Sequence, residues 1–116
     1  MELLNYKDVT PETVTEGASG VQIRWVINED MGARNFVMRH FEIMPDGYTP
    51  LHKHDWEHEI FILSGAGKIV GDNSEKPFGP GDVIFVPGNE LHQFRNTGEA
   101  PLTLLCLIPS KERCNG

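Results

Sequence analysis

The sequence predicts an all-β fold, a sandwich or a barrel of short strands, within one domain. Three observations lead to this class. Strand-forming residues gather in runs of four to nine, such as VIFVP and LTLLCLI, and no run has the spacing of an amphipathic helix. The 12 glycines and 8 prolines are scattered between those runs, where turns are needed. A chain of 116 residues is long enough for one core and too short for two.

The elements are expected in the following order. Residues 1–34 should hold an N-terminal arm, in which Pro11, Gly17 and Gly20 exclude a helix, and a first strand at 21–27. Residues 36–110 should hold the rest of the fold, starting with a strand at 36–44 that ends at Pro45, because PDGYTP is typical of a turn. Later strands are expected at 59–65, 68–71, 83–87 (buried), 91–96 and 102–108, with DNSEKPFGPGD as a long turn region.

Charge and cysteine content exclude several functions. The net charge is −7 and the basic residues are dispersed singly, which predicts neither nucleic-acid binding nor docking on an anionic membrane. No basic segment followed by an apolar one opens the chain, so we expect a cytoplasmic protein. Cys106 lies in an apolar run and Cys114 in a polar tail, and no disulfide is expected between them. A small molecule is the expected partner.

Histidines carry the chemistry of this sequence. His52 and His54 are two apart, so on an extended strand both imidazoles project from one face. His58 follows four residues later, and His92 follows a second Pro-Gly turn. A lone His-x-His pair is common on surfaces, but isolated imidazoles facing a β core are costly unless they are hydrogen-bonded or bound to a metal. The four together predict a nitrogen-rich site for a divalent metal.

Two segments resemble the motifs of the cupin superfamily. The first motif, G-x5-H-x-H-x3–4-E-x6-G, is matched at Gly47, His52, His54 and Gly65, with one residue fewer before the first histidine. The second motif, G-x5-P-x-G-x2-H-x3-N, is matched at Gly81, Pro87, His92 and Asn96. Asn89 stands in place of its middle glycine. Asparagine tolerates a left-handed turn better than other non-glycine residues. The resemblance covers residues 36–110 and implies an antiparallel double-stranded β-helix, or jelly-roll barrel, with a metal inside.

The third ligand of the first motif is either His58 or Glu59. Most cupins use glutamate there, and the forward count from His54 allows both. The motif places six residues before Gly65; six follow His58 and five follow Glu59. Parity places His58 on one strand face with Ile60 and Ile62, and Glu59 on the other. We therefore expect His58 to be the ligand, as in the small four-histidine cupins that HDWEHEIF and LCLIP resemble, with Glu59 as the alternative.

An all-histidine site leaves a divalent ion with its full +2 charge. Such a site favours anionic ligands, and protons should compete for it near pH 6. Four protein donors on an octahedral ion leave two open positions, which suits Mn²⁺ or Fe²⁺ rather than a closed tetrahedral zinc site; Ni²⁺, Cu²⁺ and Zn²⁺ are alternatives. The resemblance therefore implies an Mn- or Fe-dependent oxygenase acting on a small, anionic or aromatic substrate. Two other functions stay open: a non-catalytic sensor or storage module, and a metal-dependent lyase or isomerase.

Other residues are candidates for the pocket. Phe94 is two after His92 and should share its inward face, forming an apolar wall. Arg39 would serve an anionic substrate if it faced the pocket, although barrel arginines more often face outward. Cys106 is most simply a core residue, with a pocket thiol as the alternative. His40 should have a packing or surface role, and Trp56 should pack at a subunit interface or loop base. The resemblance also implies a homodimer.

Overall fold

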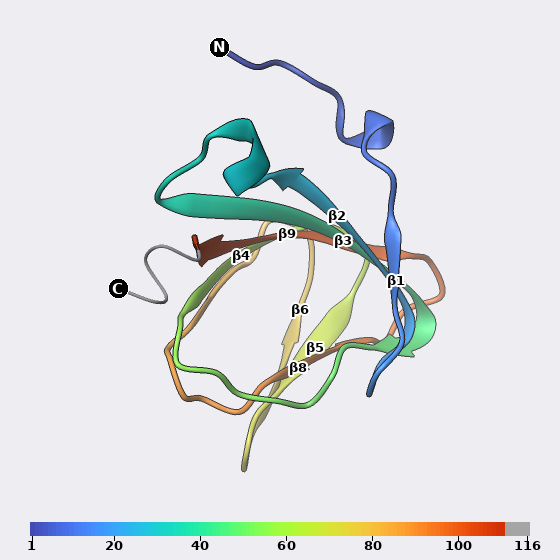
Figure 1. Ribbon diagram of the computed structural model, residues 1–116. Helices are drawn as coiled ribbons and strands as arrows, with labels where there is room; N and C mark the ends of the chain where they lie inside the picture. The colour runs from blue at the N-terminus through green and yellow to red at the C-terminus, as the bar shows by residue number, and fades with distance from the viewer. Residues whose placement is uncertain (111–116) are drawn as a thin grey trace.

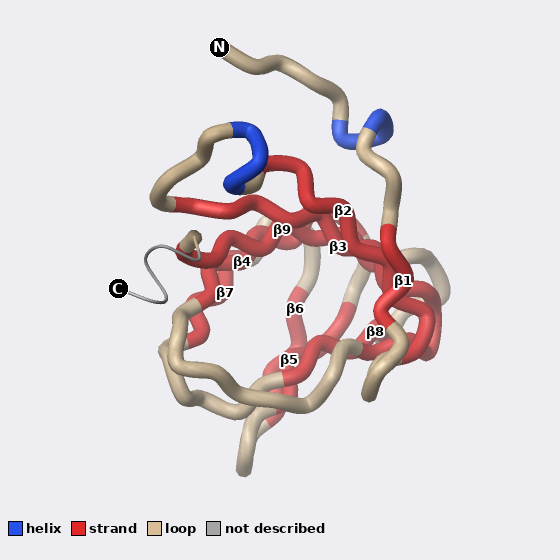
Figure 2. Tube along the Cα trace, in the orientation of Figure 1, coloured by secondary structure: helices blue, strands red, loops and turns tan. Residues whose placement is uncertain are grey.

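The computed structural model describes residues 1–110, which fold into nine antiparallel strands of one curled sheet (Figures 1 and 2). The main path through the sheet is β6-β5-β8-β3-β9-β4-β7, with β1 and β2 added beside β3. The all-β, antiparallel prediction is confirmed, and the curled sheet is a jelly-roll barrel. The strands are β1 Glu12–Val14, β2 Ser19–Ile27, β3 Phe36–Tyr48, β4 His58–Ser64, β5 Gly67–Val70, β6 Glu75–Phe78, β7 Val83–Val86, β8 Gln93–Asn96 and β9 Leu102–Pro109.

Helical structure in residues 1–110 is confined to two single turns. These are the 3-10 turns η1 (Tyr6–Asp8) and η2 (Glu29–Met31). Asn5 and Asn28 cap them, each accepting a backbone N–H through its side-chain oxygen. Neither turn has the length or the apolar composition that crossing a membrane requires.

Strand β3 joins the two halves of the barrel. It pairs with β2 and β9 along most of its length, and at its end Tyr48 pairs with Arg95 of β8. The expected stop at Pro45 is wrong, because the strand continues through an irregularity. Its register against β2 jumps from Val21↔Ile43 to Ser19↔Tyr48, and Asp46 has φ 65. Such a bulge bends the strand and carries the chain from one half of the sheet to the other.

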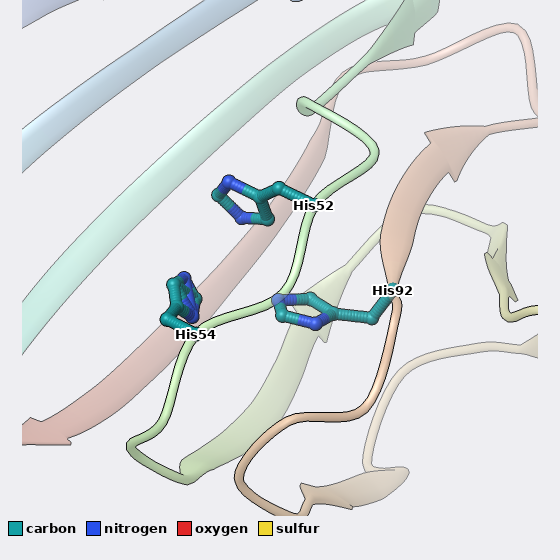
Figure 3. A group of neighbouring side chains, drawn as sticks. All are labelled: His52, His54 and His92. Carbon is teal, nitrogen blue, oxygen red and sulfur yellow. The ribbon is translucent and has the colours of Figure 1, made fainter.

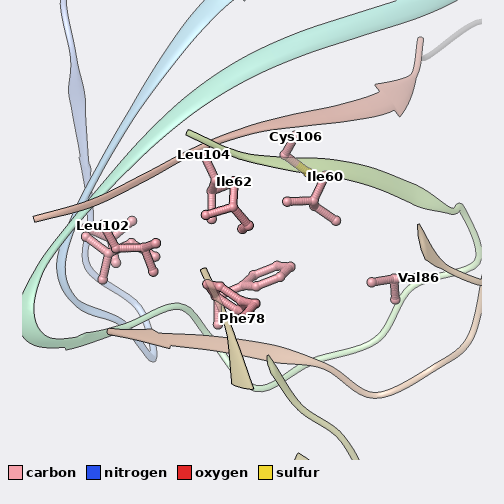
Figure 4. Packing of buried hydrophobic residues seen from close by; sticks show 10 residues of the cluster. Ile60, Ile62, Phe78, Val86, Leu102, Leu104 and Cys106 are labelled. Atoms are coloured by element: carbon pink, nitrogen blue, oxygen red, sulfur yellow. The ribbon is translucent and has the colours of Figure 1, made fainter. Parts of the chain in front are cut away.

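The core lies between the two halves of the curled sheet (Figure 4). Alternation on β4 decides which side chains enter it: Ile60 and Ile62 are buried, whereas Phe61 and Leu63 are exposed. The same alternation on β9 buries Leu102, Leu104 and Cys106. The predicted parity of the segment after His58 is therefore observed. The hydrophobic side chains Ile43, Ile62 and Leu102 are completely buried there.

Three strand expectations need correction. β1 lies in the expected arm and pairs with β2, and β6 lies in the expected turn region and pairs with β5. Both are short and polar, so only tertiary pairing makes them strands. β7 is not a buried strand, since Val83 is 72% and Phe85 58% exposed. It pairs with β4 alone and forms an edge of the sheet.

Candidate metal centre

Hydrogen bonds hold two distant segments of the chain together at the histidines. His52 and His54 lie on the loop between β3 and β4, and His92 lies just before β8. The backbone N–H of His52 donates to the carbonyl of His92 (3.2 Å), and the N–H of His92 donates back to the carbonyl of His52 (3.0 Å). The N–H of Asn89 donates to the carbonyl of His54 (2.6 Å). These backbone hydrogen bonds thus fix the positions from which the imidazole side chains project.

The ends of the loop are equally constrained. Thr49 accepts a hydrogen bond on its hydroxyl from the backbone N–H of Phe94 (2.8 Å), and its carbonyl accepts one from Gln93 Nε2 (2.9 Å). A Cβ at Gly88 would lie 2.5 Å from the carbonyl oxygen of Asp55, so only glycine allows this approach. Asn89 has φ 66, and it takes the left-handed turn expected from its place in the second motif. The turn residues therefore bring the two histidine segments into contact.

Three imidazoles converge on one space. The ring nitrogens that His52, His54 and His92 can offer all lie within 4.8 Å of one another (Figure 3). The ring centroids are 4.4 Å apart for His52 and His54, 5.1 Å for His52 and His92, and 5.3 Å for His54 and His92. These side chains come from a loop and a strand start more than thirty residues apart, so the convergence is a product of the fold.

His58 lies beside this group of three, at the start of β4. Its ring centroid is 4.6 Å from that of His54 and 4.8 Å from that of His92, and the residue is 4% exposed. Glu59 points the other way: it is exposed and lines a shallow outer groove with Glu57. The structure therefore brings together the four predicted histidines, and it places the alternative residue on the opposite face of the strand.

Ring nitrogens at this cluster are available for a metal. The Nδ1 of His92 lies 2.9 Å from the carbonyl oxygen of Glu90, which selects the tautomer with Nδ1–H and leaves Nε2 with a lone pair. Within residues 1–110, the Nδ1 atoms of His54 and His58 are buried without a hydrogen-bond partner. Buried polar atoms are rarely left unpaired in folded proteins. Neutral imidazoles with unsatisfied nitrogens are donors that suit a divalent first-row metal.

The surroundings favour the neutral form of three of these imidazoles, those of His52, His54 and His58. Burial, followed by the charges of His92, His54 and Arg39, lowers the pKa of His52 to about 4. Burial, followed by His92, Arg39 and the other two histidines, lowers the pKa of His58 to about 3. Burial also lowers the pKa of His54. For His52 and His58, protons therefore compete with a metal in stronger acid than the expected pH 6.

The histidines line a cavity of about 140 Å³ beside β1 and β2. Phe94 lines it as predicted, and Cys106 contributes from β9. Arg39 also lines it, so the expectation that barrel arginines face outward is wrong here. Its parity explains this: it shares the inward face of β3 with Phe41 and Ile43. The complete lining is Val14, Ile23, Arg39, Phe41, Thr49, Pro50, His52, His54, His58, His92, Phe94, Leu104 and Cys106.

The remaining candidates lie elsewhere. His40 is buried on the outer face of β3, where its ring is stacked on Tyr6 with centroids 4.4 Å apart. Trp56 stacks on His54 with centroids 4.3 Å apart, so within this chain it supports a histidine of the cluster. Cys114 lies outside the described residues. Sequence reasoning missed Phe41 and Thr49; period-two spacing from Arg39 could have indicated Phe41.

The fold and the histidine cluster are those of a small antiparallel β-barrel with a candidate metal centre. Residues 39–108 match the family model described as Cupin domain, Cupin_2, and the chain belongs to this family. The match lies within the part of the chain where both motifs were found.

Known proteins resemble the chain over most of its length. The solved structure of the polyketide cyclase RemF from Streptomyces resistomycificus has a TM-score of 0.89 and 36% identity, covering 96% of this chain and 80% of that one. The solved structure of a predicted oxalate decarboxylase from Thermotoga maritima has a TM-score of 0.83 and 28% identity, covering 94% and 99%.

Curated relatives add two further similarities. An oxalate-binding protein of Thermotoga maritima is 29% identical over 106 residues, 87% of this chain and 88% of that protein. A 1-methylthio-D-xylulose 5-phosphate methylsulfurylase of Rhodospirillum rubrum is 32% identical over 71 residues, 61% of this chain. That match spans 46% of the methylsulfurylase, less than half its length.

Proposed function

We propose that this chain is a metal-dependent enzyme, an oxygenase that uses Mn²⁺ or Fe²⁺ to act on a small molecule inside the barrel. The observation that carries the proposal is the convergence of four imidazoles, of which those of His58 and His92 are buried, on one cavity. His52, His54, His58 and His92 would hold the metal, and the unpartnered Nδ1 atoms of His54 and His58 support this ligand set.

The chain's own residues supply binding and isolation. When bound, a divalent ion supplies Lewis acidity to an oxygen of the ligand and, as Mn or Fe, redox chemistry towards dioxygen. Val14 and Ile23 cover the cavity from β1 and β2, and Phe94 and Leu104 form apolar walls. Such apolar walls lower the local dielectric, which strengthens electrostatic contacts within the cavity.

The cavity limits the size of the substrate. Its volume of about 140 Å³ is well below the ~300–1,000 Å³ of pockets for drug-sized ligands. The lining is apolar and aromatic apart from the histidines, Arg39, Thr49 and Cys106. A compact molecule with one or two oxygen donors therefore fits better than an extended one.

Two alternatives are each favoured by one similarity. The 36% identity to a polyketide cyclase over 96% of this chain favours a redox-neutral reaction, such as a cyclisation, lyase or isomerase step, at the same site. The 29% identity to an oxalate-binding protein favours binding of a small anion without turnover. Both would use the same four histidines, so they differ from the proposal in the reaction and not in the site.

The experiment that separates these functions is oxygen consumption under single-metal conditions. Protein reconstituted with Mn²⁺ or Fe²⁺ is mixed with catechols, enols and 2-oxo acids, and dissolved oxygen and products are followed together. The oxygenase predicts substrate-dependent oxygen uptake that is lost in His58→Ala. Product formed without oxygen uptake would establish the redox-neutral alternative, and a bound but unchanged ligand the binding module.

Assembly is proposed from the exposed edge of the sheet. Val83 and Phe85 of β7 and Phe61 of β4 are large apolar side chains exposed side by side, since Phe61 pairs with Val83. Exposed apolar edge strands tend to pair with another chain. We propose that a second copy covers this edge, giving a homodimer. Light scattering should give twice the 13.0 kDa mass of one chain. The Phe85→Lys variant should give the mass of a single chain.

A further inference from the structure

Arg39 is a positive charge inside the cavity without a negative partner. Its guanidinium carbon lies 5.0 Å from the ring centroid of Phe41 and 5.5 Å from that of Trp25. Aromatic faces attract a cation, but they do not replace an anion. The only ion pair within residues 1–110 joins Lys68 to Glu75 on the surface, and no aspartate or glutamate lines the cavity.

The hydrogen-bonding capacity of Arg39 is also unused. A guanidinium has five N–H donors. In the described part of the chain one of them is engaged: Nη2 donates to the Sγ of Cys106 at 3.0 Å. The Nε atom is buried and has no partner. A buried donor without an acceptor destabilises the fold, and a cation adds to that cost. The arrangement is therefore incomplete as it stands.

Neighbouring groups hold the guanidinium in place. Arg39 and Cys106 face each other across β3 and β9, so the thiol sits beside the arginine by strand register. Together with the rings of Phe41 and Trp25, the sulfur restricts the plane of the guanidinium, and within residues 1–110 Nη2 is its only atom with a hydrogen-bond partner. A planar donor fork fixed in this way matches the geometry of a carboxylate.

The histidines share the cavity with this cation. Arg39 lines the same 140 Å³ space as His52, His54, His58 and His92, and its charge contributes to the low pKa of His52 and His58. No acidic side chain lies between the two groups in the lining. A ligand that fills the cavity therefore meets both the guanidinium and the imidazoles.

We propose that Arg39 is the anion-binding group of this cavity, and that the ligand is a small carboxylate carrying a second oxygen donor. Its carboxylate accepts hydrogen bonds from the guanidinium, and its second oxygen faces the histidine cluster. Cys106 acts as a positioning residue for Arg39. The histidine end of this arrangement rests on the proposed function, whereas the arginine end does not.

The test measures the binding of malonate, with malonamide as the uncharged control of the same size. Calorimetric titration of metal-loaded protein should show malonate binding and at least tenfold weaker binding of malonamide. Arg39→Gln should weaken malonate binding at least tenfold, because a charge-assisted hydrogen bond is lost. Arg95→Gln is the matched control: Arg95 also stacks on a ring, that of Tyr48 at 4.7 Å, but lies outside the cavity, and its loss should leave the affinity unchanged.

Two further variants keep the test decisive. Should Arg39→Gln fail to fold, Arg39→Lys keeps the charge without the planar fork, and we expect binding about threefold weaker or worse. Cys106→Ala should weaken malonate binding several-fold, and Cys106→Ser, which keeps an acceptor, should restore it. Equal malonate affinity in the wild type and in the folded Arg39 variant would overturn the proposal, as would a full affinity for malonamide.

Failure of the proposed function is distinguishable from failure of this inference. Metal content is measured in each sample, and each titration is repeated after chelation. If no metal binds, the proposed function fails, while the difference between wild type and Arg39→Gln in the chelated protein still decides the role of Arg39. If metal binds and that difference is absent, the inference fails alone.

Discussion

Buried histidine side chains lie on both sides of β3, but only on the inner side do several of them meet. On the inner face, four imidazole rings meet around a cavity of about 140 Å³. On the outer face, His40 lies against Tyr6 beside a groove of about 940 Å³ that is formed with the N-terminal arm. The larger space is therefore on the side without a histidine cluster.

Burial and unpaired nitrogens do not by themselves distinguish the two faces. The Nδ1 of His40 is buried without a partner in the described residues, as are those of His54 and His58. Burial and the charge of Arg24 lower the pKa of His40, as burial lowers that of His58. What differs is convergence: several imidazoles from separate segments point into one space. Metal binding requires that convergence, because one imidazole is a weak site.

The largest expected effect is on metal affinity. His58→Ala removes an inward imidazole and should weaken binding of Mn²⁺ or Zn²⁺ at least about a hundredfold, since a donor is lost outright. Two control variants should bind the metal with the affinity of the wild type. They are Glu59→Ala, next to His58 but on the opposite face of β4, and His40→Ala, on the outer face of β3. Competition with a chromogenic chelator measures all three. Loss of metal in Glu59→Ala with retention in His58→Ala would show that the ligand choice is wrong.

The second effect is on stability and compares neighbours on β4. Ile62 is fully buried in the core, whereas Leu63 is 41% exposed on the outer face. Ile62→Ala should lower the free energy of unfolding by about 2–5 kcal/mol, because a cavity opens in a packed core. Leu63→Ala should cost less than about 1 kcal/mol. Urea denaturation followed by tryptophan fluorescence gives both values, and similar losses in the two variants would contradict the assignment of faces.

Much of this inner face could be predicted from the sequence. The period-two alternation after His58 gives the faces of β4, and the motif spacing gives the four histidines that converge. The environment of Arg39 could not be predicted, because its partner Cys106 is 67 residues away and meets it only through strand register. The continuation of β3 past Pro45 was also missed, since a local turn signal cannot show that a bulge will carry the strand onward.

The third effect is a pH dependence of the metal-free protein. His58 has a pKa of about 3 in the folded chain and His52 of about 4, against 6.5 when unfolded. Between about pH 6.5 and 4 the unfolded state binds protons that the folded state does not, so stability falls as the pH falls through this window. Thermal melts of chelated protein should show it. The melting temperature should fall less steeply with falling pH in His58→Gln than in the wild type. An unchanged pH dependence would contradict the low pKa of His58.

The smallest effect concerns the outer face. Tyr6 stacks on His40, and the guanidinium of Arg24 lies 5.5 Å from the centroid of its ring, so the arm is held to β2 and β3 by these contacts. Tyr6→Ala should lower the free energy of unfolding by about 1 kcal/mol, which is the contribution of an aromatic pair with a cation above it. Metal affinity should be unchanged, because the sheet separates the arm from the inner cavity. Hydrogen exchange should accelerate in residues 5–9 and stay constant near His92; faster exchange at His92 would mean that the two faces are coupled.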